Sequence, residues 1–198
     1  FRLEESGSAR FAVDQMSVVA KRMTGSQLTR PADPLGFPSE PSLQEPITAS
    51  VARTFEDSRL DSEEWDGAVA SLGGSVYMTW DWLRTWWKFY GKGRELRLIV
   101  CMVGEEIVGL IPAYIDSLGF WPLRLRVARL VGANIPPKVF DPPVARKWAG
   151  ACFAQVLQQL ICAERCDLVS LGPVSSTSEV WQSLPKEITR SGVPVNVQ

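Results

Sequence analysis

The strongest periodic pattern of apolar residues lies at positions 79–91. Its apolar side chains recur at i, i+3, i+4 and i+7, which is the spacing of one buried helical stripe: Leu83, Trp86, Trp87 and Tyr90. Thr79 has the side chain of an N-cap, and Asp81 suits the positive end of a helix dipole. Gly91 then ends the pattern. We therefore predict a helix between Thr79 and Gly91 with a buried tryptophan-rich face.

Two apolar runs on either side of a short polar connection predict a β-hairpin. Residues 96–103 and 107–115 are the strands, and residues 104–106 (Gly-Glu-Glu) are the turn. Pro112 lies inside the second run, which is typical of an edge strand, a bulge or a strand end. Residues 123–130 alternate apolar side chains with arginines, so we predict a third strand of the meander with one wetter face.

The rest of the ordered chain alternates between helix and strand. Further helices are predicted at 61–72, 144–164 and 178–190, the last with a break at Pro185. Further strands are predicted at 47–56, 167–171 and 193–197. The order predicts an α/β fold around a mixed sheet, in which an antiparallel meander is followed by parallel strands and helices flank the sheet.

The first 50 residues differ in composition from the rest. They hold five prolines and many Ser, Thr and Gly residues, without a Trp or Tyr. Such a segment buries too little apolar surface to offset its ordering entropy, so we expect most of it to be a disordered tail. Residues 11–23 are a candidate for a transient helix. We therefore divide the chain into a Pro/Ser-rich tail at 1–50 and an α/β domain at 51–198.

Composition and charge exclude several classes of partner. The 45% hydrophobic and 22% charged fractions are those of a globular protein. The net charge of -1 gives no electrostatic case for binding nucleic acid or an anionic membrane. No apolar run approaches the ~20 residues of a membrane span, and no signal-peptide core is visible. We expect a cytoplasmic protein, and, because the chain begins with Phe1, a fragment or a processed chain.

Histidine is absent, and this restricts the chemistry. Ser-His-Asp, Cys-His and His-metal sites are excluded, so acid–base catalysis would need Asp, Glu, Tyr, Lys or water. The four cysteines lie in predicted strands or helices: Cys101, Cys152, Cys162 and Cys166. The spacing of the last two leaves a metal site open, but buried free thiols in a reducing compartment are the better interpretation, and we expect no metal.

Five residues are our candidates for substrate binding: Trp80, Trp82, Tyr114, Asn134 and Asp141. The two tryptophans lie off the buried stripe, so we expect them to be exposed and able to stack on a sugar or an acyl chain, with core packing as the alternative. Tyr114 is either a proton donor or a packing residue. Asp141 either faces a cleft or caps a turn. A basic cluster meets a phosphate or only aids solubility: Lys88, Lys92, Arg94 and Arg97.

Several segments resemble one family. They are Glu64-Trp65-Asp66-Gly67-Ala68-Val69, the block 79–87 (Thr-Trp-Asp-Trp-Leu-Arg-Thr-Trp-Trp), the strands 94–100 and 107–114, and Val139-Phe140-Asp141-Pro142-Pro143-Val144. Together with the order of elements they resemble the GNAT acyltransferase superfamily, in particular the CelD/BcsL-type acetyltransferases linked to cellulose biosynthesis, which are similar to Fem-type transferases. The resemblance covers residues 51–198.

The resemblance implies an acyltransferase function whose acyl-donor site lies outside this chain. Proteins of that branch commonly have two GNAT-like halves, with the acyl-donor site in the second, so this chain resembles the first half. GNAT enzymes hold the coenzyme A pyrophosphate on a glycine-rich loop, whereas residues 130–137 here have one glycine and two prolines. We therefore expect no cofactor to bind this chain, and acetyl-coenzyme A or a related donor to serve the full-length protein.

Two main function classes remain open. The first is an acyltransferase, or its N-terminal half, in which an amine or hydroxyl of a saccharide or small-molecule acceptor attacks a thioester directly. The second is a non-catalytic GNAT-like module that packs on a second GNAT-like domain of the same polypeptide or recognises an acceptor. A purely structural α/β domain is a weaker third alternative.

Overall fold

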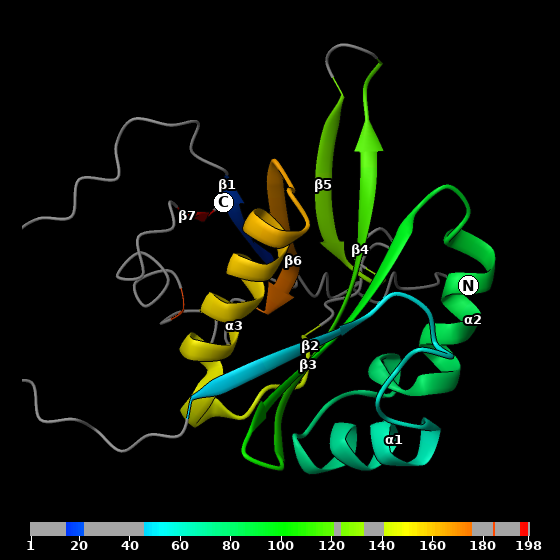
Figure 1. Cartoon of the computed structure of the whole chain (residues 1–198), viewed down its shortest axis with the longest axis vertical. Helices are drawn as coiled ribbons and strands as arrows, with labels where there is room; N and C mark the ends of the chain where they lie inside the picture. Colours follow the sequence, from blue (N-terminus) through cyan, green and yellow to red (C-terminus); the bar gives the residue numbers. More distant parts are fainter. Residues whose placement is uncertain are drawn as a thin grey trace, which may run out of the picture.

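The computed structural model describes residues 15–21, 46–120, 124–132, 141–175, 184 and 195–197. Their strands form one mixed sheet in the order β2-β3-β4-β5-β6-β1-β7 (Figure 1). The strands are β1 (Gln15–Lys21), β2 (Ile47–Ala52), β3 (Glu95–Val103), β4 (Glu106–Leu118), β5 (Leu125–Leu130), β6 (Leu168–Ser175) and β7 (Val195–Val197). An α/β fold with a mixed sheet is thus confirmed.

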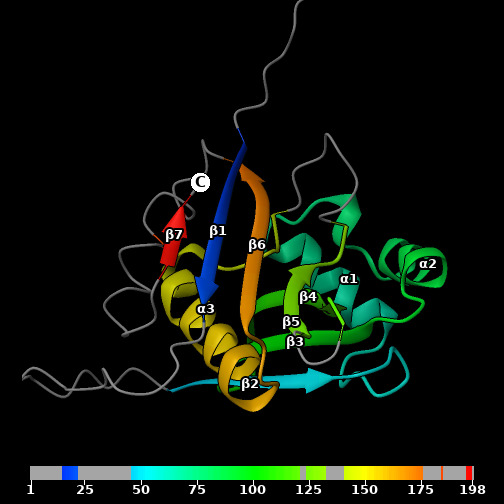
Figure 2. The same ribbon diagram turned by 90° about the horizontal axis from the view of Figure 1, so that it is seen from above.

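Helices cover both faces of the central strands (Figure 2). They are α1 (Ser62–Ser71), α2 (Trp80–Tyr90) and α3 (Ala149–Gln158), with 3-10 turns at Val76–Met78 and Arg146–Trp148 and a π-helical turn at Gln159–Ala163. Along β3, Ile99 and Cys101 pack towards α3, whereas Leu98 and Val100 pack towards α1 and α2. Because β3 is buried on both faces, its sequence is an almost continuous apolar run.

The sheet contains one parallel pair, in its middle. Strands β2 to β5 pair with one another in antiparallel fashion. Strand β6 then pairs with β5 in parallel, over Val127 to Arg129 on β5 and Leu168 to Ser170 on β6. Helix α3 lies in the crossover between these two strands, as a parallel pair requires.

Hydrogen bonds join α1 to α2. Asp61 caps α1 in a capping box with Glu64. Asp66 Oδ1 accepts the Trp80 amide at 2.7 Å, and Trp65 Nε1 donates to the Met78 carbonyl at 2.9 Å. Thr79 is the N-cap residue of α2, as predicted, but its hydroxyl bonds to the Val76 carbonyl instead of capping the helix. The first amide of α2 is therefore bonded by a side chain of α1.

Pro112 lies in a central strand, so an edge position, one of the three predicted alternatives, is wrong. Before Pro112, β4 pairs with a segment that leads into α3: Leu110 donates to the Pro143 carbonyl at 2.9 Å, and Ala145 donates to the Val108 carbonyl at 2.8 Å. After Pro112 the same edge pairs with β5. The missing N–H coincides with the change of partner, where the sheet needs no donor.

The apolar stripe of α2 is only partly buried. Leu83 and Trp86 are buried as predicted, but Trp87 is half-buried and Tyr90 is 48% exposed. Tyr90 is the last residue of the helix, and its ring lies 5.3 Å from the Trp86 ring on the outer side of the core. The prediction that Tyr90 is buried is therefore wrong.

The N-terminal segment holds a strand where we expected disorder or a transient helix. Strand β1 pairs antiparallel with β6 and β7. Its Val18 and Val19 favour strand, but the partners that make it a strand, β6 and β7, lie at the other end of the chain, so no local signal gives the pairing. Residues 1–14 and 22–45 lie outside the described residues.

The two predicted helices after β5, at 144–164 and 178–190, agree only in outline with the structure. The predicted start of the 144–164 helix is wrong, because Val144 forms a β-bridge with Gly109 and the helical residues begin with the 3-10 turn at Arg146. At the other end the helix passes into the π-helical turn. The predicted helix at 178–190 lies outside the described residues except for Leu184, which is helical and fully buried in the core under α3. None of the helices in the described ranges has both the length and the hydropathy needed to cross a bilayer.

Candidate functional site

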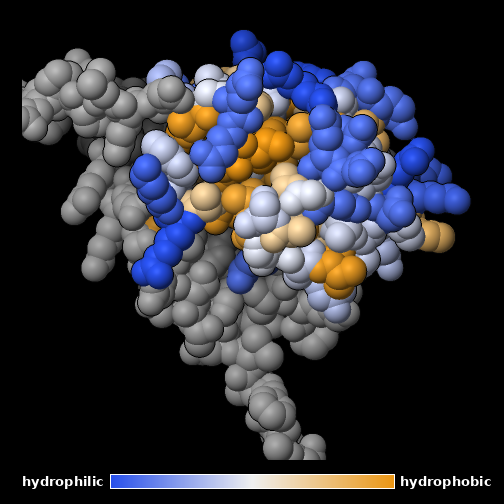
Figure 3. Space-filling view, turned by 90° about the horizontal axis from the view of Figure 1, so that it is seen from below, coloured by the Kyte–Doolittle hydropathy of each residue, from blue (hydrophilic) through white to orange (hydrophobic). Residues whose placement is uncertain are grey.

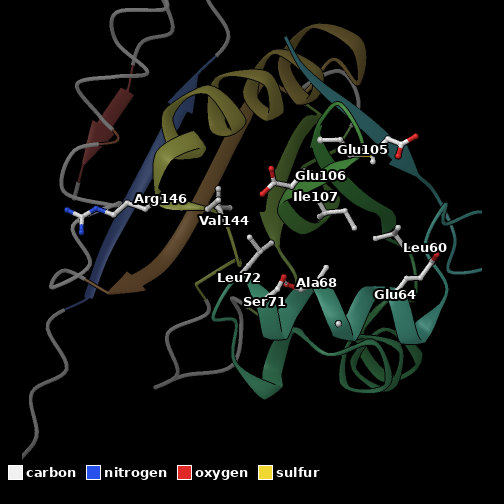
Figure 4. A pocket seen from close by; sticks show the side chains of 13 residues that line it. Leu60, Glu64, Ala68, Ser71, Leu72, Glu105, Glu106, Ile107, Val144 and Arg146 are labelled. Atoms are coloured by element: carbon white, nitrogen blue, oxygen red, sulfur yellow. Dashed lines mark hydrogen bonds between the residues drawn. The ribbon is translucent and has the colours of Figure 1, made fainter. Parts of the chain in front are cut away.

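A groove of about 920 Å³ opens between α1 and the β3–β4 turn. Its apolar lining comes from both sides and from the segment before α3: Leu60, Leu72, Met102, Ile107, Val144 and Ala145. In the close view, Leu72 and Ile107 point into the space between the helix and the hairpin, and Val144 lies at the end of the groove nearest to α3, where it packs against the core (Figure 4). The face that carries α1 and this turn exposes apolar surface bordered by hydrophilic residues (Figure 3).

The charged side chains of the groove are mainly acidic. Glu64 comes from α1, and Glu105 and Glu106 come from the β3–β4 turn. The Arg146 side chain also borders the groove but points away from it (Figure 4). The sequence predicted Glu105 and Glu106 as a solvated turn, and both are exposed. The fold adds an apolar floor beside them, which the sequence did not predict.

Gly67 on α1 is the one residue whose sequence context could have indicated this groove. It lies in the middle of a helix, where glycine costs about 0.5–1 kcal/mol relative to alanine. A Cβ built on Gly67 would meet no atom within 4 Å, so packing among the described residues does not require a glycine there. The wall of the groove is therefore open down to the helix backbone.

Tyr114 is the centre of a second feature, on the sheet face under α2. Its side chain is fully buried, and its ring lies 5.4 Å from the Trp86 ring and 4.8 Å from the Arg94 guanidinium carbon. Among the described residues, neither the Tyr114 hydroxyl nor Trp86 Nε1 has a hydrogen-bond partner. Burial raises the pKa of Tyr114, and the nearby Arg94 and Arg129 guanidinium groups oppose this effect. The phenol is protonated at neutral pH, and by geometry its hydroxyl has no acceptor among the described residues.

Tyr114 belongs to a polar row across three strands. It pairs directly with Arg129 on β5, and Arg129 pairs with Ser170 on β6. Arg129 Nε is also buried without a partner in the described part of the chain. Arg129 and Ser170 are the last pair in the short stretch over which β5 and β6 are paired. In open α/β sheets such a change in strand arrangement is a common place for a ligand.

The structure does not bring the predicted substrate-binding residues together. Trp80 is buried with its ring 5.1 Å from Phe55 and 5.7 Å from Trp65, so the prediction that it is exposed is wrong. Trp82 is half-buried, 5.5 Å from the Tyr77 ring. Asp141 is half-buried before the segment that pairs with β4, and Asn134 lies outside the described residues.

Trp80 is buried because the rings of Phe55 and Trp65, which come from other segments of the chain, pack against it. The helical spacing of apolar residues in α2 does not predict these contacts.

The predicted basic cluster is separated by the fold. Lys88 and Lys92 are exposed at the end of α2. Arg94 bonds to Asp116 at 3.0 Å and covers Tyr114, and Arg97 is buried in ion pairs. The four side chains therefore do not form one phosphate site.

A network of charges lies beside the C-terminal end of α3. Arg97 Nη2 is 2.6 Å from Glu164 Oε2 and 2.7 Å from Glu95 Oε2, and Arg126 Nη1 is 2.7 Å from Glu95 Oε1. Arg53 joins the network through Glu164 at 3.0 Å. The pKa of Glu95 is lowered from 4.5 to about 2, mainly by the hydrogen bond from Arg126 and to a smaller extent by the one from Arg97, and burial opposes this shift.

We expect this network to make folding stability acid-sensitive. A lowered folded-state pKa stabilises the fold above the unfolded value, so the contribution of Glu95 is complete above pH 4.5 and is lost as the pH falls towards about 2. The Glu95→Gln variant should lose stability at pH 7 but show a smaller further loss between pH 4.5 and pH 2. Urea unfolding at several pH values measures this. Equal pH dependence in both proteins would contradict the prediction.

Three of the four cysteines are buried free thiols, as predicted, but Cys162 is exposed in the π-helical turn. Burial raises the pKa of Cys166 to about 11. The hydrogen bond with Cys152, followed by burial, raises the pKa of Cys101. Cys101 and Cys166 are therefore thiols and not nucleophilic thiolates at neutral pH.

In the part of the chain that the structure describes, no three Cys, Asp or Glu side chains lie close enough together to ligate a metal ion.

Comparison with protein-family models gave no match, and comparison with curated protein sequences gave none either.

Proposed function

We propose that the chain is an acyltransferase domain of the GNAT type, or the N-terminal half of such an enzyme. The observation that supports this most is the sheet: four consecutive antiparallel strands, β2 to β5, followed through α3 by the parallel strand β6. That arrangement agrees with the order expected from the Trp-rich resemblance. The acceptor would be an amine or hydroxyl of a saccharide or envelope precursor, and cellulose or another polysaccharide pathway is the proposed setting.

In this proposal the acceptor attacks the thioester carbonyl directly. Its nitrogen or oxygen forms the new acyl bond, the carbon–sulfur bond breaks, and the thiolate leaves, while a carboxylate or water takes the acceptor's proton. Hydrogen-bond donors stabilise the negative charge on the carbonyl oxygen in the transition state. The chain has no histidine, and this mechanism needs none.

Tyr114 and Arg129 are the proposed contacts to the acceptor. By the geometry of the described residues, the Tyr114 hydroxyl and Arg129 Nε have no hydrogen-bond partner, and the two residues are direct neighbours across β4 and β5. The Arg129 guanidinium is close enough to lower the pKa of Tyr114 against the effect of burial. A ligand oxygen would supply the acceptor that these groups lack. Burying unsatisfied donors costs free energy, so their presence at this position favours a binding role over a packing role.

We predict that Tyr114→Phe separates these two roles. In the natural polypeptide that contains this chain, acyl transfer should fall about 10-fold, the cost of losing one hydrogen bond of about 1.4 kcal/mol to the acceptor. Stability should stay unchanged or rise slightly, because the substitution removes a hydroxyl that has no partner within the described residues. The measurements are thiol release from acetyl-coenzyme A with amino-sugar and polysaccharide acceptors, and urea unfolding. Unchanged transfer would assign Tyr114 to packing.

The donor site is the point on which the alternative function differs. The segment after β5 has one glycine, Gly132, and prolines that remove amide donors, which favours a non-catalytic module packed on a second GNAT-like domain. Calorimetric titration of the 198-residue chain with acetyl-coenzyme A should show no binding. Sub-micromolar affinity would overturn our placement of the donor site. Failure of the natural polypeptide to transfer acyl groups to any acceptor would favour the module.

A further inference from the structure

We propose that the groove beside α1 is an interface between copies of this chain, and that it takes the outer face of α2 from a second copy. This inference does not depend on the proposed activity. It rests on two surfaces that match in shape and in charge, and each carries a feature that the described contacts of the chain leave unexplained.

The groove has the form of a seat for a helix. Its α1 wall carries Gly67 and Ser71, which are one turn apart and leave the helix backbone accessible. Helix α1 has 10 residues and α2 has 11, so both are about 15 Å long at 1.5 Å per residue. A helix of that length lying along α1 would cover the apolar floor and would explain the glycine in mid-helix.

The outer face of α2 exposes an aromatic side chain and cations. Phe89 is 71% exposed. Arg84 and Lys88 are exposed one turn apart, and Lys92 follows the helix. Aromatic residues and arginine are enriched in protein interfaces, and an aromatic side chain supplies a large contact area at low entropic cost.

The charges of the two surfaces are opposite. Three carboxylates border the groove, from Glu64, Glu105 and Glu106, whereas the outer face of α2 presents three cations and the single carboxylate of Asp81. The Arg84 guanidinium is 3.9 Å from Glu56, and both side chains are mostly exposed, so this pair holds Arg84 weakly. Complementary charge directs encounter between two such surfaces and weakens with salt.

The two surfaces are different parts of one chain, so the contact is heterologous. Each copy offers one groove and one α2 face, and a contact of this type continues to further copies unless it closes into a ring. One helix in one groove is a small interface, so we expect weak association that begins near micromolar to millimolar concentration.

Sedimentation equilibrium of the full 198-residue chain, from about 1 µM to about 1 mM, tests the proposal. The wild-type average mass should rise past the dimer as concentration increases, and the rise should shrink at high salt. Gly67→Trp fills the groove, and Phe89→Ser removes the aromatic contact of α2. Each variant alone should be monomeric.

Mixing the two variants distinguishes a heterologous contact from a symmetric dimer. The variant Gly67→Trp keeps an intact α2 face, and Phe89→Ser keeps an intact groove, so an equimolar mixture should form heterodimers and nothing larger. Ala70→Trp places the same side chain on α1 outside the groove, and Val76→Ser removes another exposed apolar side chain, so both should associate like the wild type. Circular dichroism checks that every variant is folded.

Three results would overturn the proposal. The first is a wild-type chain that stays monomeric at about 1 mM. The second is association that survives Gly67→Trp, and the third is a variant mixture that remains monomeric. A monomeric wild type that binds octylamine in the groove, with binding lost in Gly67→Trp, would assign the groove to a small cationic ligand instead.

Discussion

Replacing Trp65 with alanine should lower the free energy of unfolding by about 4 kcal/mol, the largest effect we expect from one substitution. Trp65 is fully buried between α1 and α2, with its ring 5.7 Å from Trp80. Alanine would leave a cavity of nearly the whole indole. It would also leave the Met78 carbonyl, which accepts from Trp65 Nε1 at 2.9 Å, without its partner.

One further variant separates packing from hydrogen bonding at this position, and another is a control at an exposed aromatic residue. Trp65→Phe keeps most of the apolar volume and removes the indole N–H, so it should cost about 1–2 kcal/mol. Phe89→Ala removes an aromatic ring that is 71% exposed, and at low protein concentration it should change stability by less than about 0.5 kcal/mol. Urea unfolding gives all three values. A Trp65→Ala cost no greater than that of Phe89→Ala would contradict the assigned core.

Replacing Glu164 with alanine should cost about 3 kcal/mol, because it leaves Arg97 buried with half of its charged partners. Arg97 is 2% exposed, and Glu164 is 2.6 Å from it. For a chain of this length that loss corresponds to a fall of about 6–12 °C in Tm. Scanning calorimetry measures the shift.

A double variant tests whether the loss comes from the unpaired charge. Arg97→Met combined with Glu164→Leu replaces the buried pair by apolar side chains and should recover most of the stability lost in Glu164→Ala. The control is Arg84→Ala, since the Arg84–Glu56 pair spans 3.9 Å between exposed side chains and should contribute less than about 0.5 kcal/mol. A double variant as unstable as the single one would show that shape, and not charge, matters there.

The elements that the sequence predicts well are those whose signal is local. Residues 96–103 and 107–115 are apolar runs joined by a glycine turn, and they became β3 and β4. The buried positions Leu83 and Trp86 follow from helical spacing alone. Strand β1 had no such signal, since β6 and β7 at the other end of the chain define it.

The candidate sites were harder to predict because distant residues decide them. Arg97 looked like part of a surface cluster, but Glu164, which is 67 positions away, pairs with it inside the fold. Trp80 looked exposed by its helical position, but Phe55 and Trp65 enclose it. The groove depends on three separate segments. Only Gly67 hinted at it, because glycine in mid-helix needs a reason.

The change of partner at Pro112 divides β4 into two halves that can open separately. Two hydrogen bonds hold the 143–145 segment on the edge of the N-terminal half: the Leu110 amide donates to the Pro143 carbonyl, and the Ala145 amide donates to the Val108 carbonyl. Detachment of the 143–145 segment would break these bonds in one local event, without unpairing β5. The Leu110 and Ala145 amides would therefore exchange hydrogen with solvent together, and each opening would briefly uncover a bare strand edge, the feature from which aggregation starts.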